Sequence, residues 1–337
     1  MTDANGLPPA PPMKLLVTGG AGYIGSVVSR HLLHAGHEVV VLDNLLRGHR
    51  AAVAPEARLE VVDLREAEPT RRVLAEGFDG VVHFAALSLV GESVEKPELY
   101  YANNVLGTFN LLEAMRAAGV PRLVFSSTAA TYGQPEEVPI PETAPTRPTN
   151  PYGASKLSVD MMIGDWCTAH GLGAASLRYF NVAGASVGAG EDHEPETHLI
   201  PNILRVAQGR APHVQVYGTD YPTPDGTAIR DYIHVEDLSA AHLLALDATV
   251  EGKHAIYNLG TGTGFSVREV IAATERVTGG SIEVREAPRR PGDPPRLVAG
   301  SELIRSELGW DPRKTELEQM IGDAWEFAQA HPSGYSQ

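Results

Sequence analysis

The sequence is poor in cysteine, in long apolar runs and in positive charge. Its one cysteine, Cys167, cannot form an internal disulfide and lacks the clustered Cys and His residues of a zinc site. No apolar run reaches the roughly 18 residues that a membrane-spanning helix needs. A formal net charge of -15 disfavours nucleic acid and anionic lipid as partners. These absences predict a soluble globular protein that binds neither nucleic acid nor a membrane.

Two further features bear on the cell compartment. Residues 1–12 carry four prolines and no basic or apolar stretch, so we expect a flexible tail and not a secretory signal. Cys167 lies in the apolar, helical segment "MIGDWCTAH", which predicts a packed core thiol and not a nucleophile. Nothing here conflicts with a reducing compartment, and we expect a cytoplasmic protein.

Short β-branched apolar runs alternate with helical patterns up to about residue 180. The runs are "KLLVT" (14–18), "HEVVVLD" (37–43), "RLEVVDL" (58–64), "GVVHFAA" (80–86), "RLVFSST" (122–128) and "AASLRYFNV" (174–182). Strands that alternate with helices in this way form a parallel sheet with helices on both faces. The sequence thus predicts an α/β protein with a Rossmann-type, doubly wound parallel sheet.

The regular alternation breaks after Val182. A Gly-rich and acidic loop follows, and "AIYNLG" near residue 255 again has the character of a buried strand. We therefore expect two interleaved units. The first covers 13–183 and returns near 229–262, and the second, smaller α/β unit covers 184–228 and 263–330.

A glycine-rich turn joins the first predicted strand to the first helix in "KLLVTGGAGYIGS". It fits GxGxxG with Gly20, Gly22 and Gly25, and it fits GxxGxxG equally well with Gly19 in place of Gly20. Such turns let the backbone approach a pyrophosphate at a helix N-terminus. The strand before it and the helix after it favour a dinucleotide site over a chance match.

An acid at the end of the second predicted strand, Asp43, is placed to accept hydrogen bonds from an adenosine ribose. Its charge would repel a 2′-phosphate, so NAD is favoured over NADP, although Arg47 nearby leaves room for NADP. Asp63, at the end of the third predicted strand, is a candidate for the adenine side. Either acid is also compatible with a simple strand-end turn.

The segment "TNPYGASKLS" puts Tyr152 and Lys156 one helical turn apart. Asn150 suits the N-cap and Pro151 the first helical position, so Tyr152 falls in the first turn. The ammonium and the helix N-terminus both favour a phenolate, and a tyrosine so placed can take a proton from a hydroxyl whose carbon gives up a hydride. The YxxxK spacing also occurs by chance. Here it follows a nucleotide fingerprint and a hydroxyl-rich strand end, where Ser127 or Thr128 can bond the reacting oxygen.

Several motifs together carry a resemblance to a known family. "TGGAGYIGS", "HFAA", "VGES", "FSSTAATYG", "NPYGASK", "RYFNVAGA" and "DGTAIRDYIHVEDL" resemble those of the extended short-chain dehydrogenases/reductases, and within them the UDP-glucose 4-epimerases. The likeness runs from about Lys14 to Trp310. It implies a tightly held NAD that is reduced and reoxidised in each turnover, and a UDP-sugar whose C4 is inverted through a 4-keto form.

The resemblance also implies roles for individual residues. The catalytic residues would be Tyr152, Lys156 and Thr128. The NAD contacts would be Gly19, Gly22, Tyr23, Ile24, Gly25, Asp43, Asn44, Asp63, Leu64, Phe84, Ala85, Ala86, Ser126, Tyr152, Lys156 and Tyr179. The UDP-sugar contacts would be Ser127, Thr128, Tyr152, Asn181, His198, Leu199, Arg230, Arg290 and Asp293. Taken alone, Arg230 is equally compatible with an ion pair to Asp231 or Glu236.

The chain departs from the family pattern at a few positions. Ser88 stands where the family often has Lys, which removes a cationic contact to the cofactor. His198 replaces a commoner Asn. Leu297 is intermediate in size and leaves open whether the sugar carries an N-acetyl group, so an N-acetylhexosamine, a uronate or a pentose stays an alternative substrate.

Other functions are less compatible with these residues. A 4,6-dehydratase needs an Asp-Glu pair directly after Thr128, where this chain has Ala129 and Ala130. A non-catalytic nucleotide sensor has no use for the Tyr152 and Lys156 pair, and a net dehydrogenase would release NADH.

Two patterns remain, and each has a plain structural alternative. "HEPETH" lacks HExxH spacing, so we expect a solvated loop and no metal. The apolar faces of "TFNLLEAMRAAG" and "SKLSVDMMIGDWC" suggest the four-helix interface of a homodimer, as in the family, although packing onto the sheet gives the same pattern.

Overall fold

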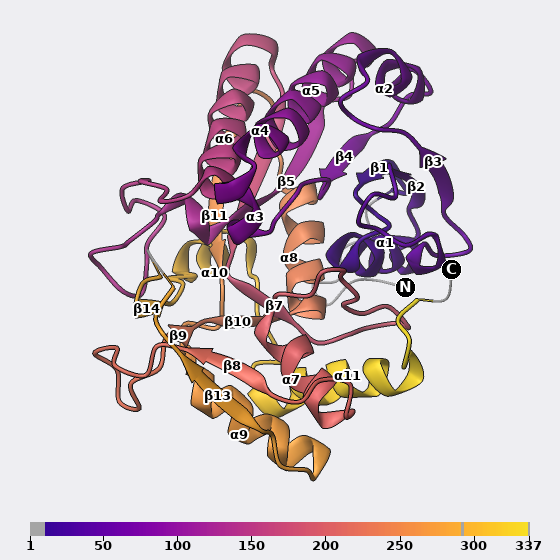
Figure 1. Cartoon of the computed structure of the whole chain (residues 1–337). Coiled ribbons are helices and arrows are strands. Elements are labelled where there is room, and N and C mark those ends of the chain that lie inside the picture. The colour runs from indigo at the N-terminus through magenta and orange to yellow at the C-terminus, as the bar shows by residue number, and fades with distance from the viewer. Residues whose placement is uncertain (1–10, 291–292, 336–337) are drawn as a thin grey trace.

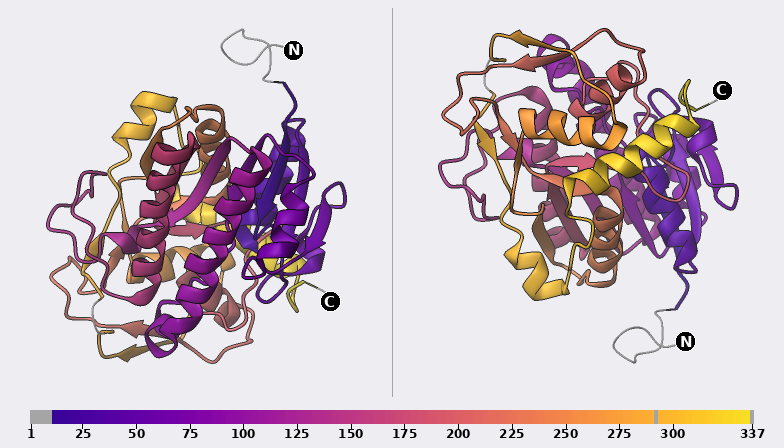
Figure 2. Two further views of the ribbon diagram at one scale, coloured as in Figure 1. Left: turned by 90° about the horizontal axis from the view of Figure 1, so that it is seen from above. Right: turned by 90° about the horizontal axis from the view of Figure 1, so that it is seen from below.

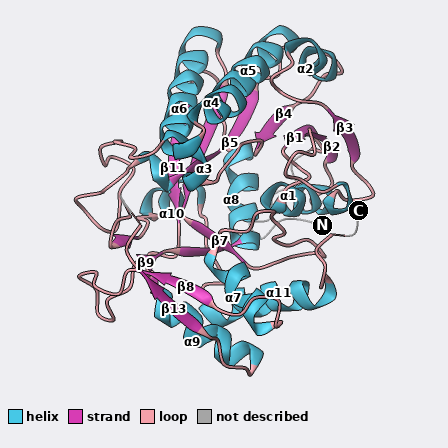
Figure 3. Ribbon diagram, in the orientation of Figure 1, coloured by secondary structure: helices cyan, strands magenta, loops and turns pink. Residues whose placement is uncertain are grey.

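The computed structural model describes residues 11–290 and 293–335 and is built on a seven-stranded parallel sheet (Figures 1 and 3). Its strand order is β11-β6-β5-β4-β1-β2-β3. The strands are β1 (Lys14–Thr18), β2 (Glu38–Asp43), β3 (Arg58–Val61), β4 (Gly80–His83), β5 (Arg122–Thr128), β6 (Gly173–Tyr179) and β11 (His254–Leu259). The predicted Rossmann-type parallel sheet is confirmed.

Helices cover both faces of this sheet, because its strands are apolar on both sides. One face packs on α1 (Tyr23–His34) and α8 (Val235–Asp247), and α10 (Glu302–Leu308) adds to the same core. The other face packs on α2 (Ala67–Leu74), α5 (Gly107–Ala118) and α6 (Pro151–His170).

The second unit lies beyond the carboxyl ends of the strands and has a core of its own (Figure 1). Its elements are α7 (Leu199–Ala207), β8 (Val214–Tyr217), α9 (Val267–Thr278), β13 (Val284–Ala287) and α11 (Leu317–Ala330). Small sheets connect the two units, formed by β7 (Asn181–Ala183), β9 (Ile229–Arg230), β10 (Tyr232–His234), β12 (Phe265–Ser266) and β14 (Arg296–Leu297).

Short elements complete the chain near the carboxyl ends of the sheet. They are η1 (Arg50–Ala52), α3 (Val90–Glu95), α4 (Pro97–Tyr100), the π-helix η2 (Tyr101–Leu106) and η3 (Ala129–Thr131). The end of α11 lies beside the first part of the chain (Figure 2), where Phe327 and Tyr335 pack with Ala52 and Ala185.

Two predicted strands differ from the observed ones. The strand predicted over 58–64 ends at Val61, so Asp63 follows the strand instead of ending it. The single strand predicted over 174–182 is wrong, because β6 ends at Tyr179 and β7 pairs with β10 in a separate sheet. The chain thus leaves the large sheet at Phe180, which positions Asn181 between the two units.

Two expectations concern the chain ends and the membrane. The tail predicted for residues 1–12 falls largely outside the described residues, which begin at residue 11. Within the part of the chain that the structure describes, no helix is long and apolar enough to span a membrane.

Candidate active site

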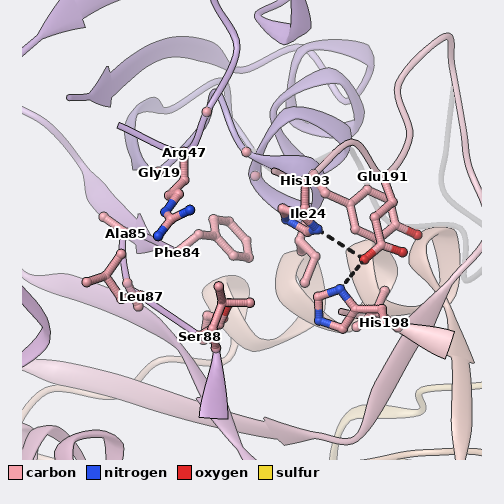
Figure 4. A pocket seen from close by; sticks show the side chains of 18 of the residues that line it. Gly19, Ile24, Arg47, Phe84, Ala85, Leu87, Ser88, Glu191, His193 and His198 are labelled. Carbon is pink, nitrogen blue, oxygen red and sulfur yellow. Dashed lines mark hydrogen bonds and ion pairs between the residues drawn. The ribbon is translucent and has the colours of Figure 1, made fainter. Parts of the chain in front are cut away.

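A cavity opens across the carboxyl ends of β1, β2, β4, β5 and β6, where the second unit closes over the large sheet (Figure 4). In parallel sheets this edge is where ligands bind. Every residue predicted to contact the cofactor lines it: Gly19, Gly22, Tyr23, Ile24, Gly25, Asp43, Asn44, Asp63, Leu64, Phe84, Ala85, Ala86, Ser126, Tyr152, Lys156 and Tyr179.

The glycine-rich turn leads from β1 into α1 at the floor of this cavity. Gly19 has φ of 74°, a conformation that favours glycine, and a Cβ at Gly25 would overlap the carbonyl oxygen of Gly19. Gly22, the N-cap of α1, also lines the cavity, whereas Gly20 packs against Val41. Of the two spacings that fit the sequence, the one that begins at Gly19 therefore faces the cavity.

The carboxylate of Asp43 lies at the end of β2 and is held by two backbone amides. Its oxygens accept hydrogen bonds from the N–H of Ala21 at 3.0 Å and of Leu45 at 2.8 Å. Burial raises the pKa of Asp43, and these two hydrogen bonds oppose that shift. The side chain is thus fixed at the cavity wall, with lone pairs left to accept from ribose hydroxyls.

Arg47, the residue that left room for NADP, is engaged elsewhere. Its guanidinium donates to the carbonyl oxygen of Glu194 at 2.7 Å and pairs with the carboxylate of Glu92 at 3.1 Å. Because these contacts engage the guanidinium of Arg47, it is not placed to bind a 2′-phosphate, which strengthens the preference for NAD over NADP.

Asp63 reaches the cavity from the segment after β3. It accepts from Asn44 at 3.1 Å and pairs with Arg65 at 2.6 Å. The hydrogen bonds from Arg65 are the main reason that the pKa of Asp63 falls to about 2. The carboxylate is therefore charged at neutral pH and can accept hydrogen bonds.

The N-terminus of α6 carries Tyr152 and Lys156, as the sequence predicts. Asn150 caps the helix by accepting from the N–H of Gly153 at 2.9 Å, and Pro151 fills the first helical position. The cap fixes the chain direction at this point, so both side chains enter the cavity.

Burial shifts the pKa of both groups toward their neutral forms. Burial lowers the pKa of Lys156 to about 7, and its ammonium donates to the carbonyl oxygen of Ser126 at 2.7 Å. Burial raises the pKa of Tyr152, while hydrogen bonding with Thr128 opposes the rise. The sequence suggested that the ammonium and the helix end favour the phenolate, and in the structure desolvation outweighs them.

The hydroxyls at the end of β5 alternate between the two faces of the sheet. Ser126 and Thr128 line the cavity. Ser127 lies on the other face and donates to Asp160 at 3.1 Å, next to the buried ion pair between Asp160 and Arg178. Successive side chains of a strand point to opposite faces. Ser127 therefore does not reach the substrate side, in contrast to the prediction.

The predicted UDP-sugar contacts fall into two groups. Thr128, Tyr152, Asn181, His198 and Leu199 line the cavity. Arg230, Arg290 and Asp293 do not line it and form a cluster of their own on the side of β9 and β14. There Arg230 pairs with Asp293 at 2.6 Å, and Arg290 lies 3.5 Å from the other oxygen of Asp293.

Arg230 thus pairs with neither of the acids that the sequence suggested. Asp231 accepts from the backbone of Thr261 and Ala299 instead, and Glu236 pairs with Lys314. The observed partner of Arg230 is far away in sequence, so no local spacing indicated it.

Other residues that line the cavity were not predicted. Asn103 belongs to the π-helix η2, an irregularity that often occurs at functional sites, but no sequence signal marks it. Glu191 and His193 come from the loop expected to be solvated, and they turn toward His198 inside the molecule. The acidic and His-rich composition was their only signal.

Comparison with known proteins fits this geometry. Residues 15–260 match the model of the NAD dependent epimerase/dehydratase family. The chain belongs to this family. A relative from Streptomyces lividans, named UDP-glucose 4-epimerase, is 60% identical over 96% of this chain and 98% of its own length.

Solved structures of family members have the same fold. The UDP-glucose 4-epimerase of Brucella ovis in complex with NAD has a TM-score of 0.89 and 44% identity, covering 93% of this chain and 97% of its own. The enzyme of Bifidobacterium longum in complex with NAD⁺ and UDP has a TM-score of 0.91 and 40% identity, covering 96% and 100%.

The epimerase/dehydratase family includes two kinds of chemistry, and the residues after Thr128 bear on the choice. Ala129 and Ala130 form the short helix η3, and the N–H of Ala130 donates to the Thr128 hydroxyl at 3.2 Å. Neither alanine can give or take a proton. This strand end therefore lacks the acid and base that elimination of water requires.

Proposed function

We propose that this protein is an NAD-dependent 4-epimerase that interconverts UDP-glucose and UDP-galactose. One observation carries the proposal: Thr128, Tyr152 and Lys156 line the same cavity as the glycine turn, while Ala129 and Ala130 lack the acid and base of a dehydratase. The name UDP-glucose 4-epimerase, which the 60% identical relative carries, agrees with it.

The cavity fits a dinucleotide at three points. Gly19 and Gly25 have no room for a side chain, the N-terminus of α1 suits a pyrophosphate, and Asp43 can accept from ribose hydroxyls. NAD bound at these residues would supply the acceptor, and then the donor, of the hydride at C4 of the sugar.

The protein side of the reaction is proton transfer at O4. Tyr152 takes the proton from the O4 hydroxyl and later returns it, and Thr128 hydrogen-bonds to the same oxygen. Because burial raises the pKa of Tyr152, the phenolate needs positive charge nearby. Lys156, from the same face of α6, and the oxidised nicotinamide ring are the two sources of this charge.

Inversion at C4 requires that the 4-keto sugar expose both faces in turn. The diphosphate must therefore be held firmly and the hexose loosely. We assign the firm contacts to Asn181, His198 and Leu199 in the cavity lining and to the charged residues Arg230, Arg290 and Asp293 beyond it. A guanidinium can donate two parallel hydrogen bonds to a pyrophosphate, and the ion pair with Asp293 holds the guanidinium of Arg230 in place.

We further propose that the protein forms a homodimer. Phe109 of α5 and Met161 of α6 are exposed, as are Val94 of α3 and Tyr101 and Leu106 of η2, two elements that pack against these helices. Apolar side chains gathered on one side mark an interface. Light scattering of the Phe109→Asp, Met161→Asp double variant should give half the mass of the native protein.

The division into domains follows from the same site. We infer an NAD-binding domain of 13–183 together with the returning chain near 229–262, and a UDP-sugar domain of 184–228 and 263–330. The cytoplasmic location expected from the sequence stays a prediction.

The test of the proposed function is an equilibrium measured from both sides. Purified protein, with no cofactor added, is incubated separately with UDP-glucose and with UDP-galactose, and the anomeric proton signals are followed by NMR. We expect both samples to reach one ratio without free NADH. If neither sample converts after NAD is supplied, the proposal is wrong.

A further inference from the structure

The loop between β7 and α7 brings two imidazoles and two carboxylates together beside the cavity. Figure 4 shows Glu191 between His193 and His198, and Glu196 completes the group. The ligand atoms of all four lie within 4.8 Å of one another. All four residues come from positions 191–198, in the loop that we expected to be solvated.

The atoms alternate in a ring of nitrogen and oxygen. His198 Nδ1 lies 2.8 Å from Glu191 and 2.9 Å from Glu196, and His193 Nδ1 lies 3.2 Å from Glu191 and 3.8 Å from Glu196. Ligands at 2.0–2.2 Å from a tetrahedral zinc are about 3.4 Å apart. The ring therefore needs only small side-chain shifts to hold such an ion.

The carboxylates are the more buried members of the group. The side chain of Glu196 is 2% exposed and that of Glu191 is 11% exposed. Two anions so close in a poorly solvated position require positive charge between them. A divalent cation at the centre of the ring supplies it to both at once.

Hydrogen bonds from neighbouring groups hold the ligand residues in place without an ion. Glu196 Oε1, which lies 2.9 Å from His198 Nδ1, also accepts from the N–H of Thr197 and of His198, both at 2.7 Å, and Oε2 faces His193 Nδ1 at 3.8 Å. Arg205 donates to the carbonyl oxygen of His193 at 3.4 Å. Contacts of this kind around the ligands are typical of metal sites.

We propose that Glu191, His193, Glu196 and His198 are the four ligands of a structural zinc site, which fixes the loop between the nucleotide cavity and α7. Two imidazoles favour zinc over calcium or magnesium, which prefer oxygen alone. Four protein ligands leave no open position for water, so the ion has a structural and not a catalytic role.

A metal-free ring is the rival arrangement. In it, a protonated His198 balances the carboxylates: Glu191 and Glu196 raise the pKa of His198 against the effect of burial, and the histidines lower the pKa of Glu191 to about 2. Such a ring binds no zinc, so metal content distinguishes the two.

The experiment measures zinc in the full-length protein, which is purified without chelators, dialysed against buffered zinc and analysed by elemental mass spectrometry. We expect one zinc per chain. His193→Ala and Glu196→Gln should each weaken zinc binding by at least about ten-fold, measured by competition with a chromophoric chelator. His34→Ala removes an exposed histidine of α1 and should bind zinc as the native protein does.

Two results would overturn the site: a native protein without stoichiometric zinc, or variants that bind zinc as tightly as the native protein. Because a variant can fail to fold, crystals of the native protein grown with zinc provide a second measurement. An anomalous peak at the zinc edge between the four side chains supports the site, and a difference map without one there contradicts it.

Discussion

The ammonium of Lys156 lies 2.7 Å from the carbonyl oxygen of Ser126, and so ties the first turns of α6 to the end of β5. It also lies 4.6 Å from the centre of the Phe125 ring. These contacts hold the buried Lys156 amino group in the cavity that Tyr152 and Thr128 also line. They thereby fix the position of α6, which carries the proposed base Tyr152, relative to β5, which carries the Thr128 hydroxyl.

This burial predicts how stability depends on pH. Burial lowers the pKa of Lys156 to about 7 in the folded protein, whereas the pKa of a lysine in the unfolded chain is 10.5. Between these values the unfolded state binds more protons, so stability rises with pH across this window. Lys156→Met removes the titrating group and with it this rise of stability with pH. The variant should be the more stable protein at pH 7, by a margin that shrinks by on the order of 1 kcal/mol per pH unit.

Urea unfolding of the nucleotide-free protein from pH 7 to pH 9.5 measures this margin. Lys96→Met, which removes an exposed ammonium, is the control and should keep the native dependence on pH. If the stability difference between Lys156→Met and the native protein does not change with pH, burial does not lower the pKa of Lys156.

Removal of the phenol should separate chemistry from binding. Tyr152→Phe keeps the ring that packs edge-on against Tyr100 and removes only the proton acceptor. We expect kcat to fall by about 10²–10⁴, the usual contribution of general acid–base catalysis, with NAD still bound. Turnover is followed by NMR and bound NAD by absorbance after denaturation. Near-normal turnover would exclude Tyr152 as the base.

The ion pair under the site should contribute strongly to stability. Asp160 and Arg178 lie 2.9 Å apart, and their side chains are 3% and 4% exposed. Asp160→Asn leaves the guanidinium buried without its counter-charge, and we expect a loss of about 3–5 kcal/mol in the free energy of unfolding. Asp165→Asn changes an exposed aspartate of the same helix and should stay within about 0.5 kcal/mol. Equal effects of the two changes, measured by urea unfolding, would contradict this explanation.

The glycine turn offers a steric test. Gly25→Ala puts a Cβ against the carbonyl oxygen of Gly19, so the turn must shift. We expect weaker NAD binding and a loss of about 1–3 kcal/mol in stability. Gly322→Ala adds a Cβ that meets nothing within 4 Å in α11 and should stabilise by about 0.5–1 kcal/mol. Calorimetric NAD titration and thermal unfolding provide the comparison, and an unchanged NAD affinity in Gly25→Ala would argue against the turn as the binding site.

The sequence predicts those features that depend on neighbours along the chain. The parallel sheet follows from alternating strand and helix patterns, and the start of α6 follows from Asn150 and Pro151. The position of Asp43 at the end of β2 is equally local. In each case one short segment contains all the information.

Features that depend on distant segments escaped prediction. β6 ends at Tyr179 because the next residues pair with β10. Arg230 pairs with Asp293, 63 residues away. Ser127 donates to Asp160, 33 residues away, and the loop with His193 turns inward because Arg205 and Arg47 bind its backbone. Spacing along the chain does not determine such contacts.

The central claim, that one bound NAD takes a hydride from C4 and returns it to the same sugar, is tested most directly with deuterium. UDP-galactose carrying deuterium at C4 is converted in ordinary water, and the UDP-glucose formed is analysed by NMR and mass spectrometry. The account predicts that the deuterium stays at C4 and that no free reduced cofactor accumulates. Loss of the label to solvent, or its release in free reduced nucleotide, would contradict it.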